Sequence, residues 1–137
     1  MTVGVAIFAH GSSIASANDA VRLVAERVAR QGGFDLVEAA FLEQGSPDLA
    51  EAVRRLIDRG ASRILVVPYF LTLGLHLQRD LPRIVEEISR IQHNVDIRIT
   101  APLDGHPAMA EALIDRVREG EAIWNAAADD GKTSGVP

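Results

Sequence analysis

Residues 66–82 have the sequence VVPYFLTLGLHLQRDLP, and they join the most apolar part of the chain to a histidine. The segment begins as a continuous apolar run, which predicts a strand buried on both faces. His76 comes after this run and is followed by Arg79 and Asp80. A buried strand that leads to a titratable side chain indicates a ligand site, although His76 could equally be an ordinary loop histidine.

The composition excludes several classes of protein. The chain has 137 residues, which is enough for one domain with a substantial core. Its net charge of -5 argues against a general nucleic-acid or anionic-membrane surface, because phosphate binding depends on clustered Lys and Arg. Cysteine is absent, which excludes disulfides, thiolate metal sites and cysteine nucleophiles. The N-terminal apolar run ends at Ala9, too short for a membrane span or signal peptide, so we expect a cytoplasmic protein.

Four short apolar runs predict the strands of a sheet, at residues 3–9, 36–42, 63–69 and 95–99. They alternate with amphipathic segments, which is the pattern of a parallel sheet with right-handed crossovers. The first and third runs are almost wholly apolar and belong at the centre, whereas polar residues within the second and fourth place those runs at the edges. We therefore predict a flavodoxin-like, three-layer α/β/α fold with a four-stranded parallel sheet of order 2-1-3-4.

The amphipathic segments predict four helices, whose expected starting or capping residues are Ser16, Ser46, Asp80 and Pro107. In the second helix, Pro47 would occupy the first helical position. The fourth helix is expected to reach about as far as Trp124. Residues 125–137 have no apolar period, so we predict a single domain over residues 1–124 followed by a disordered tail.

Three of the four histidines come after strands, at the edge of the sheet where ligands bind. In an open parallel sheet of this order, a crevice forms between the carboxyl ends of the first and third strands. His10 follows the first strand and His76 comes after the third, while Glu43 and His106 follow the second and fourth; His93 lies at the opposite end. Two neutral imidazoles and a carboxylate suit a divalent iron, cobalt, nickel or zinc ion.

Each of these residues also has a plainer interpretation. His10 could satisfy backbone groups in a tight turn, Glu43 could be a solvated carboxylate, and His106 could be a helix-entry residue. Residues 11–13, Gly-Ser-Ser, could form an anion-binding nest near a helix N-terminus. They lack the Lys and the second Gly of a P-loop, which argues against a nucleotide phosphate site.

Four segments together carry a family resemblance: FAHGSS at residues 8–13, FLEQGSPDLAEAV at 41–53, VVPYFLTLGLHLQRDLP at 66–82 and LDGHPAMAEAL at 103–113. In this order they resemble the small class II chelatases of the sirohydrochlorin cobaltochelatase and ferrochelatase type, CbiX and SirB. The resemblance implies insertion of a divalent metal ion, cobalt first and otherwise iron or nickel, into sirohydrochlorin in cobalamin or sirohaem biosynthesis. It also implies a homodimer and no cofactor beyond the metal substrate.

The resemblance implies roles for single residues as well. His10 and His76 would be the catalytic, metal-handling histidines, and Glu43 would be the active-site acid. An apolar surface for the flat tetrapyrrole or for a second subunit would come from Phe70, Leu71, Leu73, Leu75 and Leu77, although these residues could also simply pack in the core. Within this stretch, Leu73, Gly74 and Leu75 are the expected substrate-binding residues. The nearest candidates to receive the carboxylates of the substrate are Ser12, Ser13 and Arg79, although Arg79 could equally be a surface residue.

Two other classes of function remain open at this level. A protein of the same fold could carry the metal ion or the tetrapyrrole without catalysis. The chain could also be an unrelated flavodoxin-like binding domain whose histidines are incidental. Catalysed insertion of metal distinguishes the chelatase from both.

Overall fold

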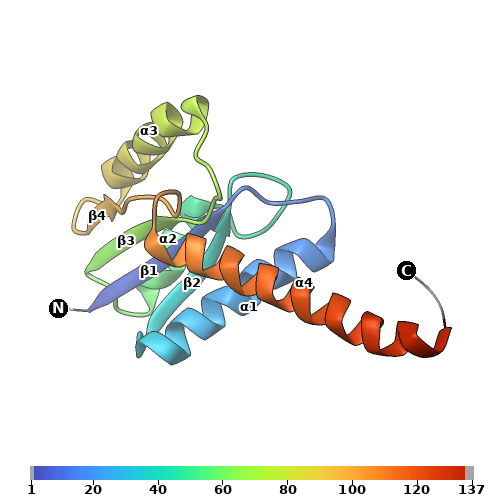
Figure 1. Ribbon diagram of the computed structural model, residues 1–137. Helices are drawn as coiled ribbons and strands as arrows, with labels where there is room; N and C mark the ends of the chain where they lie inside the picture. The colour runs from blue at the N-terminus through green and yellow to red at the C-terminus, as the bar shows by residue number, and fades with distance from the viewer. Residues whose placement is uncertain (1, 135–137) are drawn as a thin grey trace. The chain divides into compact units, whose positions relative to one another are not determined.

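A four-stranded parallel sheet forms the centre of the fold (Figure 1). The computed structural model gives the strands as β1 (Val3–Ala9), β2 (Leu36–Phe41), β3 (Arg63–Pro68) and β4 (Asp96–Ile99). Their order is β2-β1-β3-β4, with every neighbouring pair parallel, which confirms the predicted topology. In the register of the sheet, Val5 of β1 lies opposite Val37 of β2 and Leu65 of β3.

The structure describes the backbone of residues 2–134 and the side chains of residues 2–127. Its contacts divide the chain into two units, Met1–Asp104 and Gly105–Pro137. The first unit contains the whole sheet and three helices, and the second contains the last helix. The single domain expected over residues 1–124 stays a prediction.

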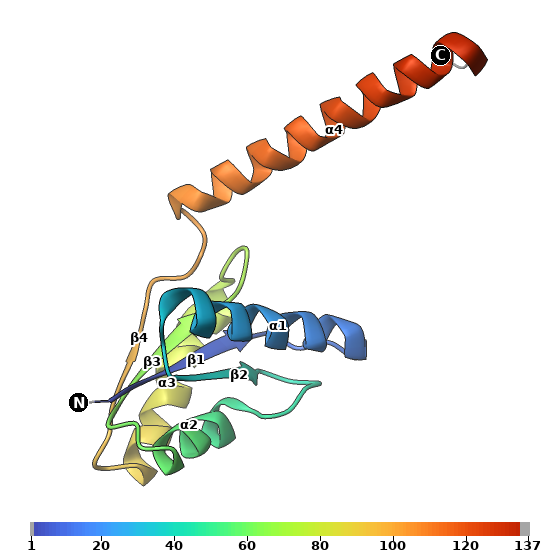
Figure 2. The same ribbon diagram turned by 90° about the horizontal axis from the view of Figure 1, so that it is seen from below.

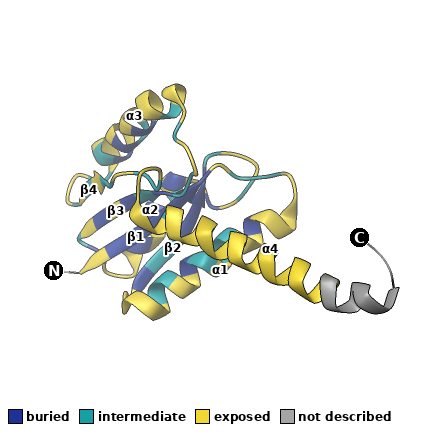
Figure 3. Cartoon of the chain, in the orientation of Figure 1, coloured by how far each residue is buried: buried dark blue, intermediate teal, exposed yellow. Residues whose placement is uncertain are grey.

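Burial along the strands follows their places in the sheet. In β1, residues 4–9 are all buried, as expected for a central strand covered on both faces. In β4, exposed and half-buried residues alternate, as expected for an edge strand. The dark blue of buried residues is concentrated on the central strands in Figure 3.

Helices cover the sheet in two layers, which Figure 2 shows edge-on. Helix α1 (Ala15–Gly32) packs on one face, where Ala25 joins Val5 and Ile7 in a small apolar cluster. Helices α2 (Leu49–Asp58) and α3 (Leu75–Ile91) pack on the other face over a larger core. That core includes Phe8, Val53, Leu56, Ile64, Leu81 and Val85. Successive side chains of β1 point to opposite faces of the sheet, so this one strand contributes residues to both apolar clusters.

All three helices of the first unit begin at other residues than predicted. Helix α1 begins at Ala15 with Ile14 at the N-cap position and no side-chain cap, so Ser16 is not its cap. Helix α2 begins at Leu49, and the carboxylate of its N-cap, Asp48, accepts a hydrogen bond from the Glu51 amide. Ser46 and Pro47 both precede α2, so Pro47 is not its first residue as predicted. The chain first passes beside the end of β2, where the Phe41 amide donates to the Pro47 carbonyl, and only then turns into the helix.

Helix α3 begins one and a half turns earlier than predicted, so the expected cap at Asp80 is wrong. Its N-cap is Gly74, and the Gln78 amide donates to the Gly74 carbonyl at 3.0 Å. Leu77 and Leu81, four residues apart, both pack on the core, which favours a helix through this segment. Pro82, expected in the first turn, therefore lies inside the helix.

The second unit consists mainly of helix α4 (Pro107–Ser134). The Nδ1 atom of His106 accepts a hydrogen bond from the Ala108 amide at 3.0 Å, so His106 caps this helix. The helix continues beyond Trp124, and residues 125–134 of the predicted tail are helical. Residues 135–137 lie outside the described residues. No helix in the described part of the chain is long and apolar enough to cross a membrane.

Candidate functional site

His10 and Glu43 come together at the carboxyl ends of β1 and β2. The parallel pairing continues past both strands, because the Leu42 amide donates to the Ala9 carbonyl at 2.9 Å and the Glu43 amide donates to the His10 carbonyl at 3.0 Å. The two side chains then meet, with His10 Nε2 lying 3.4 Å from Glu43 Oε1. Both are open to solvent, with 57% of the His10 side chain and 58% of the Glu43 side chain exposed.

The hydrogen bonds of the His10 ring indicate what it can bind. Its Nδ1 lies 3.1 Å from the Gly11 carbonyl oxygen, which can only accept, so Nδ1 is assigned as the protonated nitrogen. In the neutral ring, Nε2 then carries a lone pair that faces the Glu43 carboxylate. Both atoms can therefore contact the same metal ion or share a proton.

The separation of the two atoms is compatible with a metal ion that both contact. Imidazole nitrogen and carboxylate oxygen bind a divalent transition metal at about 2.1 Å. Two such bonds from atoms 3.4 Å apart would meet at an angle of about 110°, close to the tetrahedral value. The pair supplies only two ligands, and within the described residues no three His, Cys, Asp or Glu side chains are grouped to hold a metal ion.

Gly11 allows the two loops to approach each other closely. Its φ of +91° lies in the region that only glycine adopts readily. A Cβ atom added at this position would lie 1.7 Å from the carbonyl oxygen of Glu43. Any residue with a Cβ atom at position 11 would therefore clash with the backbone of the loop that carries Glu43.

Asn18 is a site residue that the sequence reasoning missed. It lies in the first turns of α1 and is only 6% exposed. Its Oδ1 accepts from the Ser12 amide at 2.9 Å, and its Nδ2 donates to the Ser12 carbonyl at 2.8 Å and the Gln44 carbonyl at 2.9 Å. The sequence does contain a signal for it. Asn18 lies seven residues before Ala25 and ten before Val28, so a helix places this polar residue on the same face as those two apolar residues.

His76 lies in the first turn of α3 and not in a loop. Its side chain is exposed, and within the described residues it makes no hydrogen bond or ion pair. Arg79 is also exposed and comes three residues later, so it lies on the same side of the helix as His76. The structure thus pairs His10 with Glu43 and places His76 on a separate element, at the N-terminal end of α3.

The other predicted substrate-binding residues differ in their exposure to solvent and in the hydrogen bonds that they already make. Leu75 is 72% exposed, Gly74 is exposed and Leu73 is half-buried, so this part of the apolar surface is open. Ser13 is exposed as well. The Ser12 amide is already bonded to Asn18, and the Ser12 hydroxyl accepts from the Ile14 amide at 3.0 Å. Ser12 therefore shapes the loop, and the donor that it still offers to a substrate carboxylate is its hydroxyl group.

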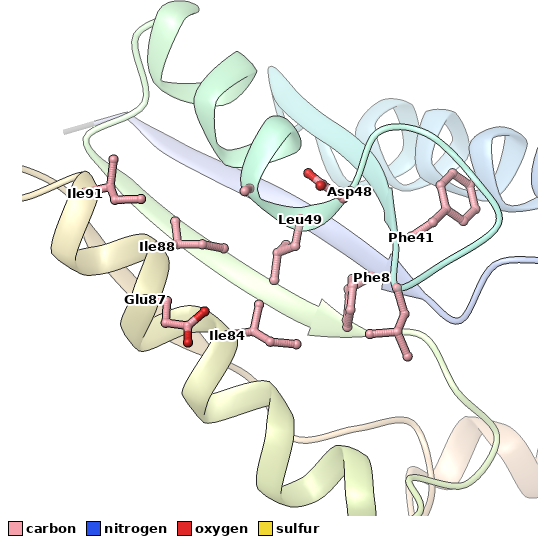
Figure 4. A pocket seen from close by; sticks show the side chains of 10 residues that line it. Phe8, Phe41, Asp48, Leu49, Ile84, Glu87, Ile88 and Ile91 are labelled. Atoms are coloured by element: carbon pink, nitrogen blue, oxygen red, sulfur yellow. The ribbon is translucent and has the colours of Figure 1, made fainter.

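An apolar cavity of about 290 Å³ lies between α2 and α3 (Figure 4). Ile84 and Ile88 of α3 point toward Leu49 of α2 and Phe8 of β1 in this view. None of the predicted site residues lines it. The cavity is thus distinct from the pair formed by His10 and Glu43.

Comparison with known proteins identifies the family of the chain. A model of the CbiX family matches residues 4–120. The chain belongs to the CbiX family. The match includes all four segments on which the resemblance rests, and it confirms that resemblance.

Relatives of this CbiX protein include two archaeal proteins, both named sirohydrochlorin cobaltochelatase. One, from Methanopyrus kandleri, is 30% identical over 137 aligned positions that cover 85% of this chain and 96% of the relative. The other, from Saccharolobus islandicus, is 36% identical over 123 positions that cover 85% of this chain and 94% of the relative.

Solved structures share the fold of this CbiX chain. A crystal structure of a putative cobalamin biosynthesis CbiX protein from Marinobacter aquaeolei has a TM-score of 0.77 and 30% identity, covering 88% of this chain and 98% of the other. The sirohydrochlorin chelatase SirB from Bacillus subtilis, in complex with cobalt, has a TM-score of 0.80 and 21% identity. The alignment covers 87% of this chain but 51% of SirB, so the likeness to SirB concerns the fold of about half of that protein.

Proposed function

We propose that this CbiX-family chain inserts a divalent metal ion into sirohydrochlorin. The observation that carries the proposal is the exposed pair of His10 and Glu43, whose facing atoms are 3.4 Å apart at the carboxyl edge of the sheet. Support for this substrate comes from the family and from relatives named sirohydrochlorin cobaltochelatase. The chain is, on this proposal, a metal chelatase of the lyase class.

The pair meets the chemical needs of metal insertion. The ion must lose water as ring nitrogens replace it, and two pyrrole N–H protons must leave the macrocycle. His10 Nε2 has a free lone pair in the neutral tautomer, so it can accept a proton or bind the incoming ion. The Glu43 carboxylate, 3.4 Å from Nε2, can contact the same ion or take part in removing the protons. Both groups are exposed, so substrate and ion can reach them from solvent.

The remaining surface near α3 suits the macrocycle. Leu71 is 71% exposed and Leu75 is 72% exposed, so together they offer an apolar face to a flat ring. Arg79 is exposed one turn after His76 and would receive a substrate carboxylate. The metal is a substrate, and we propose no further cofactor. Among cobalt, nickel and iron we place cobalt first, because the relatives are named cobaltochelatases.

The test is an anaerobic absorbance assay with purified protein, sirohydrochlorin and cobalt(II), nickel(II) or iron(II) in separate cuvettes. Each reaction runs beside a control without protein, because metals also insert spontaneously. Faster loss of the metal-free spectrum supports the chelatase and ranks the metals. A bound macrocycle that is not converted faster than in the control would indicate a carrier and would overturn the proposal.

Replacing His76 by Ala is expected to lower kcat/KM for insertion at least about 10-fold. The imidazole is exposed in the first turn of α3, so its loss removes a metal ligand or proton acceptor without disturbing the core. His93→Ala is the matched control, because His93 is also exposed but lies in the turn before β4, at the opposite end of the sheet. Equal activity of the two folded variants would remove His76 from the site.

We also propose that the chain works as a homodimer in the cytoplasm. Among the residues whose side chains are described, one chain brings together the pair of His10 and Glu43 and no third ligand of this kind. A second copy would bring further ligands and apolar surface. Sedimentation velocity is expected to give the mass of a dimer at the protein concentrations used in the assay. A monomer at those concentrations, with full activity, would contradict the dimer.

A further inference from the structure

Asn18 is the one buried polar side chain among the residues whose side chains the structure describes. Burying an amide is unfavourable unless its donors and acceptor are bonded, and here one acceptor and two donors are all used. Hydrophobic packing alone would have placed an apolar residue at this position of α1. A fully bonded buried amide therefore indicates a specific structural task.

The partners of Asn18 belong to the two loops that carry the site. Ser12 comes two residues after His10, and Gln44 comes directly after Glu43. One amide group is thus bonded to both loops, although the residues it joins are 32 positions apart in the sequence. It connects them through their backbones, so it acts on the position of each loop and leaves the side chains of His10 and Glu43 free.

The Glu43 loop depends on this support. Gln44 has a φ of +55°, in the left-handed region that is unfavourable for residues other than glycine. Its carbonyl is the group that accepts from Asn18 Nδ2 at 2.9 Å. The hydrogen bond therefore stabilises the strained backbone conformation next to Glu43.

Only an asparagine satisfies all three bonds in the available space. An aspartate at position 18 would keep the acceptor for the Ser12 amide but would place a carboxylate oxygen against two carbonyl oxygens. The site is also tight, because a Cβ atom added at Gly45 would lie 3.1 Å from Asn18 Nδ2. A longer glutamine would not fit without moving the loops.

We propose that Asn18 is a positioning residue, which sets the separation of His10 and Glu43 by holding the two loops that bear them. The inference rests on the proposed function only for its effect on catalysis, since the hydrogen bonds exist whatever the substrate. Asn18 does not contact the reacting atoms; it acts through the backbone at Ser12 and Gln44. Its loss changes the geometry of the pair while the apolar surface near α3 stays in place.

The expected kinetic result is a fall in kcat of about 10-fold to 100-fold in Asn18→Asp and Asn18→Ala, with the KM for sirohydrochlorin within about 3-fold of wild type. The control is Gln31→Leu, which removes an exposed amide from the same helix. All variants are compared in the anaerobic assay after circular dichroism has established that they are folded.

A double-mutant cycle separates positioning from a general loss of stability. If Asn18 acts through the pair, Asn18→Ala should have little further effect once Glu43→Gln has removed the carboxylate, so the two losses should not multiply. A purely structural residue would lower the activity of the wild-type and Glu43→Gln proteins by the same factor. Multiplying losses, or an equal fall in the Gln31→Leu control, would overturn the proposal.

Hydrogen exchange tests the same inference without any catalytic assay. In Asn18→Ala, the amides of residues 11–14 and 43–46 should exchange at least about 10-fold faster, while those in the C-terminal half of α1 should be unchanged. Unchanged exchange in both loops would overturn the positioning role even in an active enzyme. Faster exchange in a protein that inserts no metal would instead reject the proposed function and leave the positioning role standing.

Discussion

Replacing His10 by Ala is expected to lower kcat for metal insertion by at least about 100-fold. The imidazole supplies the lone pair that faces the Glu43 carboxylate at 3.4 Å, and Ala leaves neither a proton acceptor nor a metal ligand there. The free energy of unfolding should change by less than about 0.5 kcal/mol, because 57% of the side chain is exposed. The variant should therefore lose activity while it remains folded.

The assay for His10→Ala uses the anaerobic absorbance measurement with His93→Ala beside it. Added imidazole should restore part of the rate if His10 mainly accepts a proton, because a small base can diffuse into the space that the side chain leaves. No restoration would favour a metal ligand that must be held in place. Wild-type activity in a folded His10→Ala protein would exclude His10 from the site.

Replacing Gly11 by Ala is expected to destabilise the protein by about 2 to 5 kcal/mol. Two effects add at this position. The φ of +91° is unfavourable for alanine, and the new Cβ would overlap the Glu43 carbonyl oxygen, at a distance of 1.7 Å. Relief of the overlap requires the loops of His10 and Glu43 to separate, so kcat should fall as well.

Gly33→Ala is the matched control for the Gly11 variant. Gly33, at the end of α1, has a φ of +71°, but a Cβ atom there would meet nothing within 4 Å. This variant should therefore lose only about 1 to 2 kcal/mol, from the left-handed backbone alone, and keep its activity. Urea denaturation measures both losses. Equal losses in the two variants would contradict the close approach of the two loops.

Much of this fold follows from apolar patterns that are local in the sequence. The run VGVAIFA predicts a strand buried on both faces, and all of its residues after Val3 are buried in β1. The alternation in residues 95–99 predicts an edge strand, and β4 lies at the edge. Right-handed crossovers then leave few strand orders, which is why the order 2-1-3-4 could be predicted.

The helix starts were less predictable, because several good caps compete within a few residues. Ser46 and Asp48 are both strong N-cap residues, and Asp48 caps α2 because the chain before it first lies against β2. Asp80 is also a good cap, but Leu77 and Leu81 gain contact with the core when the helix starts earlier. Packing of the whole unit therefore outweighs local capping preference.

The sequence by itself determined the strands, their order, and the placement of His10 and Glu43 after neighbouring parallel strands. Those features depend on residue periodicity and on the geometry common to all parallel sheets. Only the tertiary structure decided that the two side chains meet at 3.4 Å, that Gly11 must be glycine, and that Asn18 ties both loops together. Each of these depends on close contact between segments distant in the chain, and such contacts leave no periodic signal in the sequence.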